Sequence, residues 1–458
     1  MTTPSASAAT SRFSRSQSDL RQLVHDVVAY AKGRGATASE AEISEGFGQS
    51  ITVRRGTVET IEHNRDKGLG VTIYMGQRKG YASTSDLSEK AWRETVDAAM
   101  SIARYTAPDE CAGLPDRDLL ALDSADMPEL DLYHPWTIPV GEAIDLAARC
   151  EQAAFDVSSQ ITNSEGATVS IQEGQFALAN SLGFVGGYPT SRHYLACSVI
   201  AGEGDGMQRD DWYSTARDPR DIGDAAAIGD YAARRALSRL NGRRIRTGDY
   251  PVIFEAPIAS SLLGNLTHAT SGGALYRKTT FLLDHLGKPV MAPHLQLREE
   301  PHLCKGLGSS PFDSDGVRTR AREVVRDGVL MGYFLSTYSA RKLGMKSTGN
   351  AGGCHNLTID STLVKPDFNG LLRQMGRGLL VTELLGQGVN YVNGDYSRGA
   401  AGYWVENGVI AYPVDEITIA GNLGQMLHGI VAVGNDVLVR GSKSTGSILI
   451  DRMTVAGS

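Results

Sequence analysis

The chain has 458 residues, of which 41% are hydrophobic and 21% charged, with a formal net charge of −7. These values are typical of a soluble protein of two or three domains, and the acidic balance gives no support to direct nucleic-acid binding. No run of about 18 apolar residues is present, so nothing is predicted to span a membrane. The five cysteines are widely spaced and include no CxxC pair, which favours a reducing cytoplasm.

The N-terminal region predicts a tail followed by an α+β domain. Residues 1–17 are rich in Ser, Ala and Thr and predict disorder. A helix is expected from Ser18, as its cap, to Lys32, and a second from Leu87 to Tyr105. Gly56 marks a hairpin turn between strands of alternating polarity. The expected strands are Ala41–Gly46, Ser50–Arg54, Thr57–Glu62, Gly70–Tyr74 and Gly80–Ser83. Residues 18–106 are therefore predicted to form the first domain.

A proline-rich linker, residues 107–139, leads into a second predicted α+β domain at residues 140–242. Its helices are expected at Val140–Ser158 and Asp224–Leu240. Between them we expect strands at Gln160–Asn163, Thr168–Gln172, Gln175–Asn180, Phe184–Pro189 and His193–Ala201. The helix-then-strands order repeats that of the first unit, so an internal duplication is one interpretation.

Residues 243–458 predict a β-rich C-terminal domain. A strand at Tyr250–Phe254 and a buried helix at Ala259–Thr270 come first, and most later segments read as strands. The most informative segment is Gly388–Leu423, where glycines recur between aromatic and β-branched residues. This pattern predicts short antiparallel strands with tight turns, in a closed or strongly coiled sheet. The predicted fold class is α+β, with two sheet-plus-helix units and an antiparallel barrel-like C-terminal domain.

Candidate metal and nucleophile sites are weak. His285, His294, His302 and Cys304 lie close in sequence but are separated by prolines, so ordinary surface and packing histidines are the alternative to a metal site. Cys354 and His355 are adjacent, and neighbouring residues of a strand point to opposite faces. Ser309 and Ser310 lie in a turn, and neither a GxSxG elbow nor a phosphate loop occurs. Four C-terminal carboxylates could form an acid–base pair or accept hydrogen bonds from Arg398 and the turns: Asp395, Glu406, Asp415 and Glu416.

Several long motifs resemble the PmbA/TldE branch of the TldD/PmbA family. The resemblance spans roughly residues 20–458. Its motifs are EHNRDKGLGVTIYMGQRKGYASTSDLS (62–88), GSSPFDSDGV (308–317), KLGMKSTGNAG (342–352), GLLVTELLGQGVN (378–390), GDYSRGAAGYWVENG (394–408), YPVDEITIAGNL (412–423) and IVAVGNDV (430–437).

The resemblance implies a metallopeptidase system. In this family the TldD-type partner carries an HExxxH metal helix and a late cysteine ligand, and it pairs with a PmbA/TldE-type subunit to digest unfolded or extended peptides. The pair matures peptide antibiotics or degrades antitoxins.

This chain departs from the TldD pattern at each ligand position. Its corresponding helix segment, Glu255–Gly273, has no HExxxH, and Arg440–Ile450 has no cysteine. No catalytic residue, metal ligand or cofactor is therefore expected on this chain, and zinc is expected on the partner.

Two functional hypotheses follow. The first is a cytoplasmic, metal-free subunit that completes the peptide chamber of a TldD-type partner. Tyr396, Arg398 and Trp404 are then predicted to contact the peptide or the partner, with barrel packing as the alternative role, above all for Trp404. The second hypothesis is a non-catalytic regulatory or binding protein that works alone, for example as a homodimer that modulates another macromolecule. Whether the chain has any activity by itself is left open.

Overall fold

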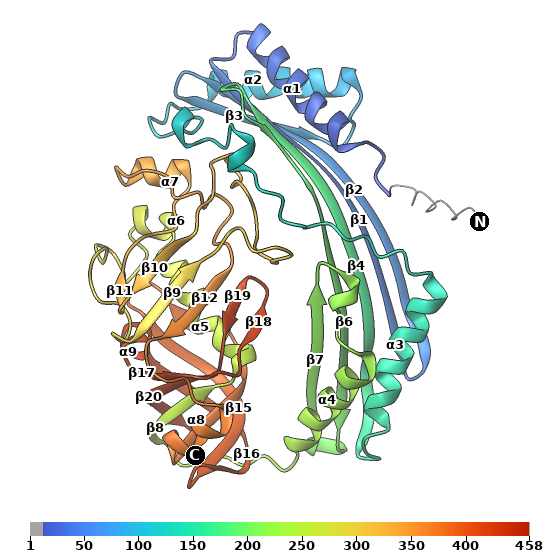
Figure 1. The fold of residues 1–458 in the computed structure, drawn as a ribbon, viewed down its shortest axis with the longest axis vertical. Helices are drawn as coiled ribbons and strands as arrows, with labels where there is room; N and C mark the ends of the chain where they lie inside the picture. The colour runs from blue at the N-terminus through green and yellow to red at the C-terminus, as the bar shows by residue number, and fades with distance from the viewer. Residues whose placement is uncertain (1–11, 458) are drawn as a thin grey trace, which may run out of the picture.

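A long curved sheet and a C-terminal domain on its concave side make up the molecule (Figure 1). This computed structural model describes residues 12–457. The strands of the sheet lie in the order β3-β2-β1-β4-β6-β7, and β5 pairs with β4. Its elements are α1 (Gln17–Gly33), β1 (Ala38–Arg54), β2 (Thr57–Met75), β3 (Arg78–Thr84), α2 (Glu89–Tyr105), α3 (Val140–Phe155), β4 (Ile161–Asn180), β5 (Val185–Gly186), β6 (Pro189–Ala201), β7 (Gln208–Ala216) and α4 (Ala225–Ser238).

The strands are longer than the sequence predicts. Segments predicted as separate strands at Ala41–Gly46 and Ser50–Arg54 are one strand, β1, and three predicted strands merge in β4. The polar and glycine-containing stretch of β1 resembles a loop in sequence, but its pairing with β2 and β4 continues through it. The hairpin turn between β1 and β2 is confirmed, since Arg55 and Gly56 have φ of 51° and 72°. Strand β7 was not predicted.

The two predicted N-terminal units share this one sheet, because β1 pairs antiparallel with β4 from Glu40 opposite Asn180 to Val53 opposite Ala167. Helices α1 and α2 cover one end of a sheet face, and α3 and α4 cover the other end. Ile43 packs in the first core and Ile51 in the second, and their even spacing along β1 places both cores on the same face. Each half has the same order of helix, strands and helix.

The middle of that face is polar and is covered by the start of the described chain. The predicted disordered tail, residues 1–17, lies partly outside the described residues, but from Arg12 onward it contacts the sheet. Arg12 pairs with the buried Glu173 at 3.2 Å, and Gln175 donates a hydrogen bond to the carbonyl of Arg15. Helix α1 begins after Ser16, two residues before the predicted cap, because Ser16 and Asp19 form a capping box.

The C-terminal domain contains a barrel of five strands, which confirms the predicted fold class. Pairing runs β8-β20-β16-β15-β13 and closes because β13 also pairs with β8. The barrel strands are β8 (Gly248–Phe254), β13 (Gly378–Leu385), β15 (Asp395–Glu406), β16 (Val409–Asn422) and β20 (Ile448–Ala456), with β14 (Val389–Asn390) and β17 (Ile430–Val433) at its ends. Because the barrel is closed, few of its strands have an unpaired edge, and its interior belongs to one continuous apolar core.

A second sheet of six strands adjoins the barrel, in the order β11-β10-β9-β12-β19-β18. Its strands are β9 (Leu295–Glu299), β10 (Arg322–Arg326), β11 (Val329–Leu330), β12 (Leu357–Ser361), β18 (Leu438–Arg440) and β19 (Lys443–Thr445). The short helices are α6 (Gly272–Tyr276), α7 (Thr337–Lys342), α8 (Phe368–Met375) and α9 (Leu423–His428). The predicted buried helix Ala259–Thr270 is present as α5 (Ala256–Ala269), which begins three residues earlier.

The sheet and the C-terminal domain meet through aromatic packing. Phe312 of the C-terminal domain lies 5.0 Å from Phe184 and 5.6 Å from Tyr188, measured between ring centroids. The linker contains only the short 3₁₀ helices η1 (Arg117–Leu119) and η2 (Ser124–Asp126) among its regular elements. It packs against the C-terminal domain where Arg318 N donates to the carbonyl of Leu119. Within residues 12–457, no helix combines the length and apolar character needed to cross a membrane.

Candidate functional site

Two adjoining cavities lie between the concave face of the sheet and the loops of the C-terminal domain. They have volumes of about 530 and 380 Å³ and share Glu42, Leu178 and Ser314 as lining residues. The sheet contributes residues of β1, β2, β3 and β4, and the C-terminal domain contributes the loops 307–314 and 351–355. We call this space the interdomain cleft. Its walls come from segments that are far apart in the sequence and side by side in the fold (Figure 1).

Carboxyl groups with raised pKa values stand in and beside the cleft. Burial, reinforced by the negative charge of Asp315, raises the pKa of Glu40 to about 7. The same two causes raise the pKa of Asp313 to about 7, although three backbone N–H groups donate to its carboxylate. The bond from Ala351 joins the two C-terminal loops, and the bonds from Asp315 and Val317 close the turn that follows Asp313. Burial therefore favours the protonated form of both carboxyl groups up to a higher pH than usual.

Replacing Glu40 with glutamine is expected to stabilise the protein only at higher pH. Because the folded-state pKa is raised from 4.5 to about 7, the stability contributed by Glu40 falls as the pH rises through this window. The Glu40→Gln variant should gain about 1–3 kcal/mol over the natural chain at pH 8 and nothing at pH 4. Urea unfolding at both pH values tests this, with the exposed Glu62→Gln on β2 as the control. A gain that does not change with pH would contradict the expectation.

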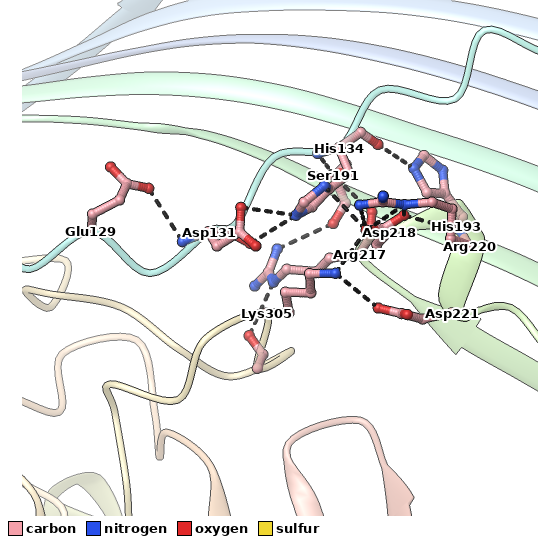
Figure 2. Close-up of polar contacts among 11 residues, drawn as sticks. Glu129, Asp131, His134, Ser191, His193, Arg217, Asp218, Arg220, Asp221 and Lys305 are labelled. Atoms are coloured by element: carbon pink, nitrogen blue, oxygen red, sulfur yellow. Dashed lines mark hydrogen bonds and ion pairs between the residues drawn. The ribbon is translucent and has the colours of Figure 1, made fainter.

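Figure 2 shows a polar cluster beside the cleft that joins the linker, the end of β7 and a C-terminal loop. The side chain of Asp218 is almost fully buried. It forms ion pairs with Lys305 of the C-terminal loop at 2.7 Å and with Arg220 at 2.6 Å. These two cations hold the pKa of Asp218 well below its usual range. His134 of the linker lies between carboxylates, 3.1 Å from Asp131 and 3.4 Å from Asp218.

A second set of contacts in the same cluster ties the backbone of the loop to the sheet. Arg217 donates to the carbonyl oxygens of Gly306 and Leu307 at 3.0 and 3.1 Å, and also to that of Ser191. Leu307 lines the interdomain cleft. The cluster therefore fixes one wall of the cleft against the other, and it positions the loop rather than presenting reactive groups.

The helix α5 and the hairpin of β18 and β19 lie side by side (Figure 1). At their contact, a Cβ atom added to Gly264 would lie 3.7 Å from Cε of Lys443. His268, near the end of α5, stacks on Tyr391 with ring centroids 4.0 Å apart. Within residues 12–457, no group of three His, Cys, Asp or Glu side chains is arranged to hold a metal ion.

The three predicted contact residues lie on β15 of the barrel. Tyr396 and Trp404 are buried in the apolar core, and Trp404 Nε1 donates to Glu406 at 3.0 Å. Arg398 is half-buried and lies 3.5 Å from the carbonyl oxygen of Leu384. In this single chain the two aromatic side chains therefore pack the barrel, and their contact with a peptide or a partner stays a prediction.

The other candidate residues are dispersed. His294 contacts Ser361 and the carbonyl of Ile430, whereas His302 contacts Thr319. The ring of His355 lies 2.9 Å from the carbonyl oxygen of Gly349. The four C-terminal carboxylates also have separate partners: Asn393 for Asp395, Trp404 for Glu406, Gln208 for Asp415 and Arg244 for Glu416.

Sequence reasoning missed the residues of the cleft. Glu40 and Glu42 belong to an ordinary alternating strand, and only the pairing of β1 within the curved sheet turns them toward the C-terminal loops. The motif GSSPFDSDGV carries part of the family resemblance, and it supplies Ser310, Phe312 and Asp313 to the cleft. An unusually polar, glycine-rich motif in a loop is the signal that could have marked this wall.

Comparisons with known proteins agree with this architecture. The chain matches the PmbA/TldA metallopeptidase domain 1 at residues 39–103, the central domain at 133–240 and the C-terminal domain at 247–457. It is 49% identical to "Metalloprotease PmbA" of Escherichia coli O157:H7, over 96% of each chain.

Two solved structures show the same fold. A "putative modulator of DNA gyrase" from Bacteroides thetaiotaomicron has a TM-score of 0.90 and 27% identity, with coverage of 96% of this chain and 99% of the other. TldE from Thermococcus kodakarensis has a TM-score of 0.79 and 19% identity, with coverage of 95% and 100%. The fold is thus that of the TldD/PmbA metallopeptidases, and the chain belongs to the PmbA branch of that family.

Proposed function

We propose that this chain is the metal-free, TldE-type subunit of a cytoplasmic heterodimer with a TldD-type metallopeptidase chain. The observation that carries the proposal is the contact between α5 and β19. The family resemblance implies that a TldD-type chain has its metal ligands on this helix and near the C-terminus. Here the two segments bring Gly264 against Lys443, and neither residue offers an imidazole or a thiolate.

The residues at this contact do not fit a catalytic zinc ion. Such a site needs about three protein ligands and an open position, and it favours nitrogen, sulfur and carboxylate donors. A lysine ammonium beside a glycine supplies none of these donors. We therefore assign the zinc, and the chemistry that it supplies, to the TldD-type partner.

The substrate class that we propose is an unfolded or extended peptide. Support comes from the interdomain cleft, whose walls are strands and glycine-containing loops that a peptide backbone can approach closely. In the heterodimer this cleft would extend the partner's chamber, and the subunit would hold the peptide while the partner cleaves it.

Co-expression with a TldD-type chain tests the proposal. We expect the two chains to co-purify, zinc to be present only with the partner, and casein or an unstructured peptide to be cleaved only by the pair. A partner in which the Glu of HExxxH is replaced by Gln provides the matched control, since it should still associate but not cleave.

Two outcomes would overturn the assignment. Stoichiometric zinc together with peptide cleavage by this chain alone would show that it is itself the peptidase. A chain that never associates with a TldD-type protein would instead favour a regulator that works alone.

A further inference from the structure

A second groove lies between β7, an edge strand of the long sheet, and the hairpin of β18 and β19. Two cavities of about 520 and 220 Å³ open there, and both are lined by Trp212, Tyr213 and Arg440. One wall is apolar, since Trp212 packs edge-on against Tyr231 with ring centroids 4.6 Å apart and Val439 is 55% exposed. None of these residues lines the interdomain cleft.

Arg440 is held in place without a counterion. Its guanidinium lies 3.9 Å from the ring centroid of Tyr213 and 4.5 Å from that of Trp212, and Nη1 donates to the carbonyl of Tyr213. Within residues 12–457, no carboxylate forms an ion pair with it. The neighbouring arginines differ: Arg235 pairs with Asp210 and Glu255, each at 3.0 Å, and Arg239 pairs with Glu383. A half-buried cation of this kind gains most from an incoming anion.

An unpaired polar group lines the smaller cavity beside Arg440. Thr382 is 7% exposed, and its hydroxyl has no hydrogen-bond partner among the described residues. Buried hydroxyls are normally hydrogen-bonded, so this one is available to a ligand. The exposed Asp211 lines the same cavity, and its charge acts on Arg440 from beyond ion-pair distance.

From these features we propose that the groove binds an extended peptide segment through a carboxylate, which pairs with Arg440. An apolar side chain of the same segment packs on Trp212 and Tyr231. That the ligand is a peptide rests on the proposed function. That it binds through a carboxylate is supported by Arg440, which has no ion-pair partner within residues 12–457. One free arginine beside an aspartate suits a single negative charge better than a nucleic-acid backbone, which needs several cations. The carboxylate can belong to a C-terminus or to an Asp or Glu side chain.

Fluorescence anisotropy with short labelled peptides and the full chain alone tests the proposal. Three peptides share one neutral, Leu-containing sequence: one has a free C-terminus, one a C-terminal amide, and one an amide plus an internal Asp. We expect the first or the third to bind about 10- to 100-fold more tightly than the neutral amide, as for a charge-assisted hydrogen bond. Which of the two binds identifies the source of the carboxylate.

Substitutions in the groove test whether the peptide binds there. Arg440→Gln should remove the preference for the carboxylate, whereas Asp211→Asn should strengthen it. The matched control is Arg452→Gln, because Arg452 is an exposed arginine that pairs with Asp249. Equal affinities for the three peptides, or tighter binding of a short single-stranded oligonucleotide, would overturn the proposal, and this comparison of ligands needs no variant to fold. Since no partner chain is present, these results are independent of the co-purification that tests the heterodimer.

Discussion

Replacing Gly402 with alanine is expected to destabilise the C-terminal barrel by about 3 kcal/mol. Gly402 lies on β15 opposite Val381 of β13 and Val414 of β16. A Cβ atom added there would lie 1.9 Å from the carbonyl oxygen of Leu380. That oxygen is backbone of the strand that closes the barrel, so the clash can be relieved only by parting β13 from β15. Urea unfolding followed by tryptophan fluorescence measures the loss.

Gly264→Ala is the matched control for this substitution. Gly264 lies in α5, and an added Cβ would meet only the flexible end of Lys443, at 3.7 Å. Alanine has the higher helix propensity, so the free energy of unfolding should stay the same or rise by up to about 1 kcal/mol. If Gly402→Ala unfolds like the natural chain, β13 and β15 do not close the barrel in solution.

Arg322→Met is expected to cost about 3–5 kcal/mol and to loosen the C-terminal wall of the interdomain cleft. Arg322 Nε donates to Glu299, which is 1% exposed, at 2.7 Å. Glu299 also accepts hydrogen bonds from Asn350 and from the backbone N–H of His355, so it anchors the loop 351–355. Removing the guanidinium leaves a buried carboxylate without its cation. Thermal unfolding measures the cost, and peptide cleavage by the co-expressed pair measures the effect on the cleft.

The ion pair of Arg326 and Glu323, whose side chains are 55% and 30% exposed, provides the comparison for this prediction. Arg326→Met removes the same kind of side chain from the same strand, β10, but its partner Glu323 is far more accessible to water than Glu299. We expect a loss of less than about 1 kcal/mol. The double variant Arg322→Met, Glu299→Gln should recover part of the stability, because the uncompensated charge is gone. An equal cost for both single variants would show that Glu299 is not a buried anchor.

The two grooves differ in chemical character. The interdomain cleft is polar, with Glu40 and Asp313 near their titration points at neutral pH. The groove at β7 combines the rings of Trp212 and Tyr213 with the guanidinium of Arg440.

The sequence predicted local features well. Apolar spacing located helices such as α2 and α4 to within two residues, and Gly56 marked the first hairpin. Long motifs identified the family, which the domain matches confirm. Each of these features is encoded within a short stretch of chain, because periodicity and turn chemistry depend on near neighbours.

The choice of strand partners could not be read from the sequence. Alternation in β1 predicts a strand but does not say that β4, more than a hundred residues later, lies beside it. The same limit applies to Trp212 and Arg440, which meet only because β7 lies at the outer edge of the sheet.

The sequence by itself therefore determined the α+β class, the family, and the absence of an HExxxH motif and a late cysteine from Arg440–Ile450. Tertiary structure alone decided that the first two units form one sheet, that Tyr396 and Trp404 face the barrel core, and that Arg440 lacks a counterion within residues 12–457. The physical reason is that burial and charge pairing depend on which distant segments meet. Those meetings follow from backbone hydrogen bonds between strands and from packing, and no local pattern encodes them.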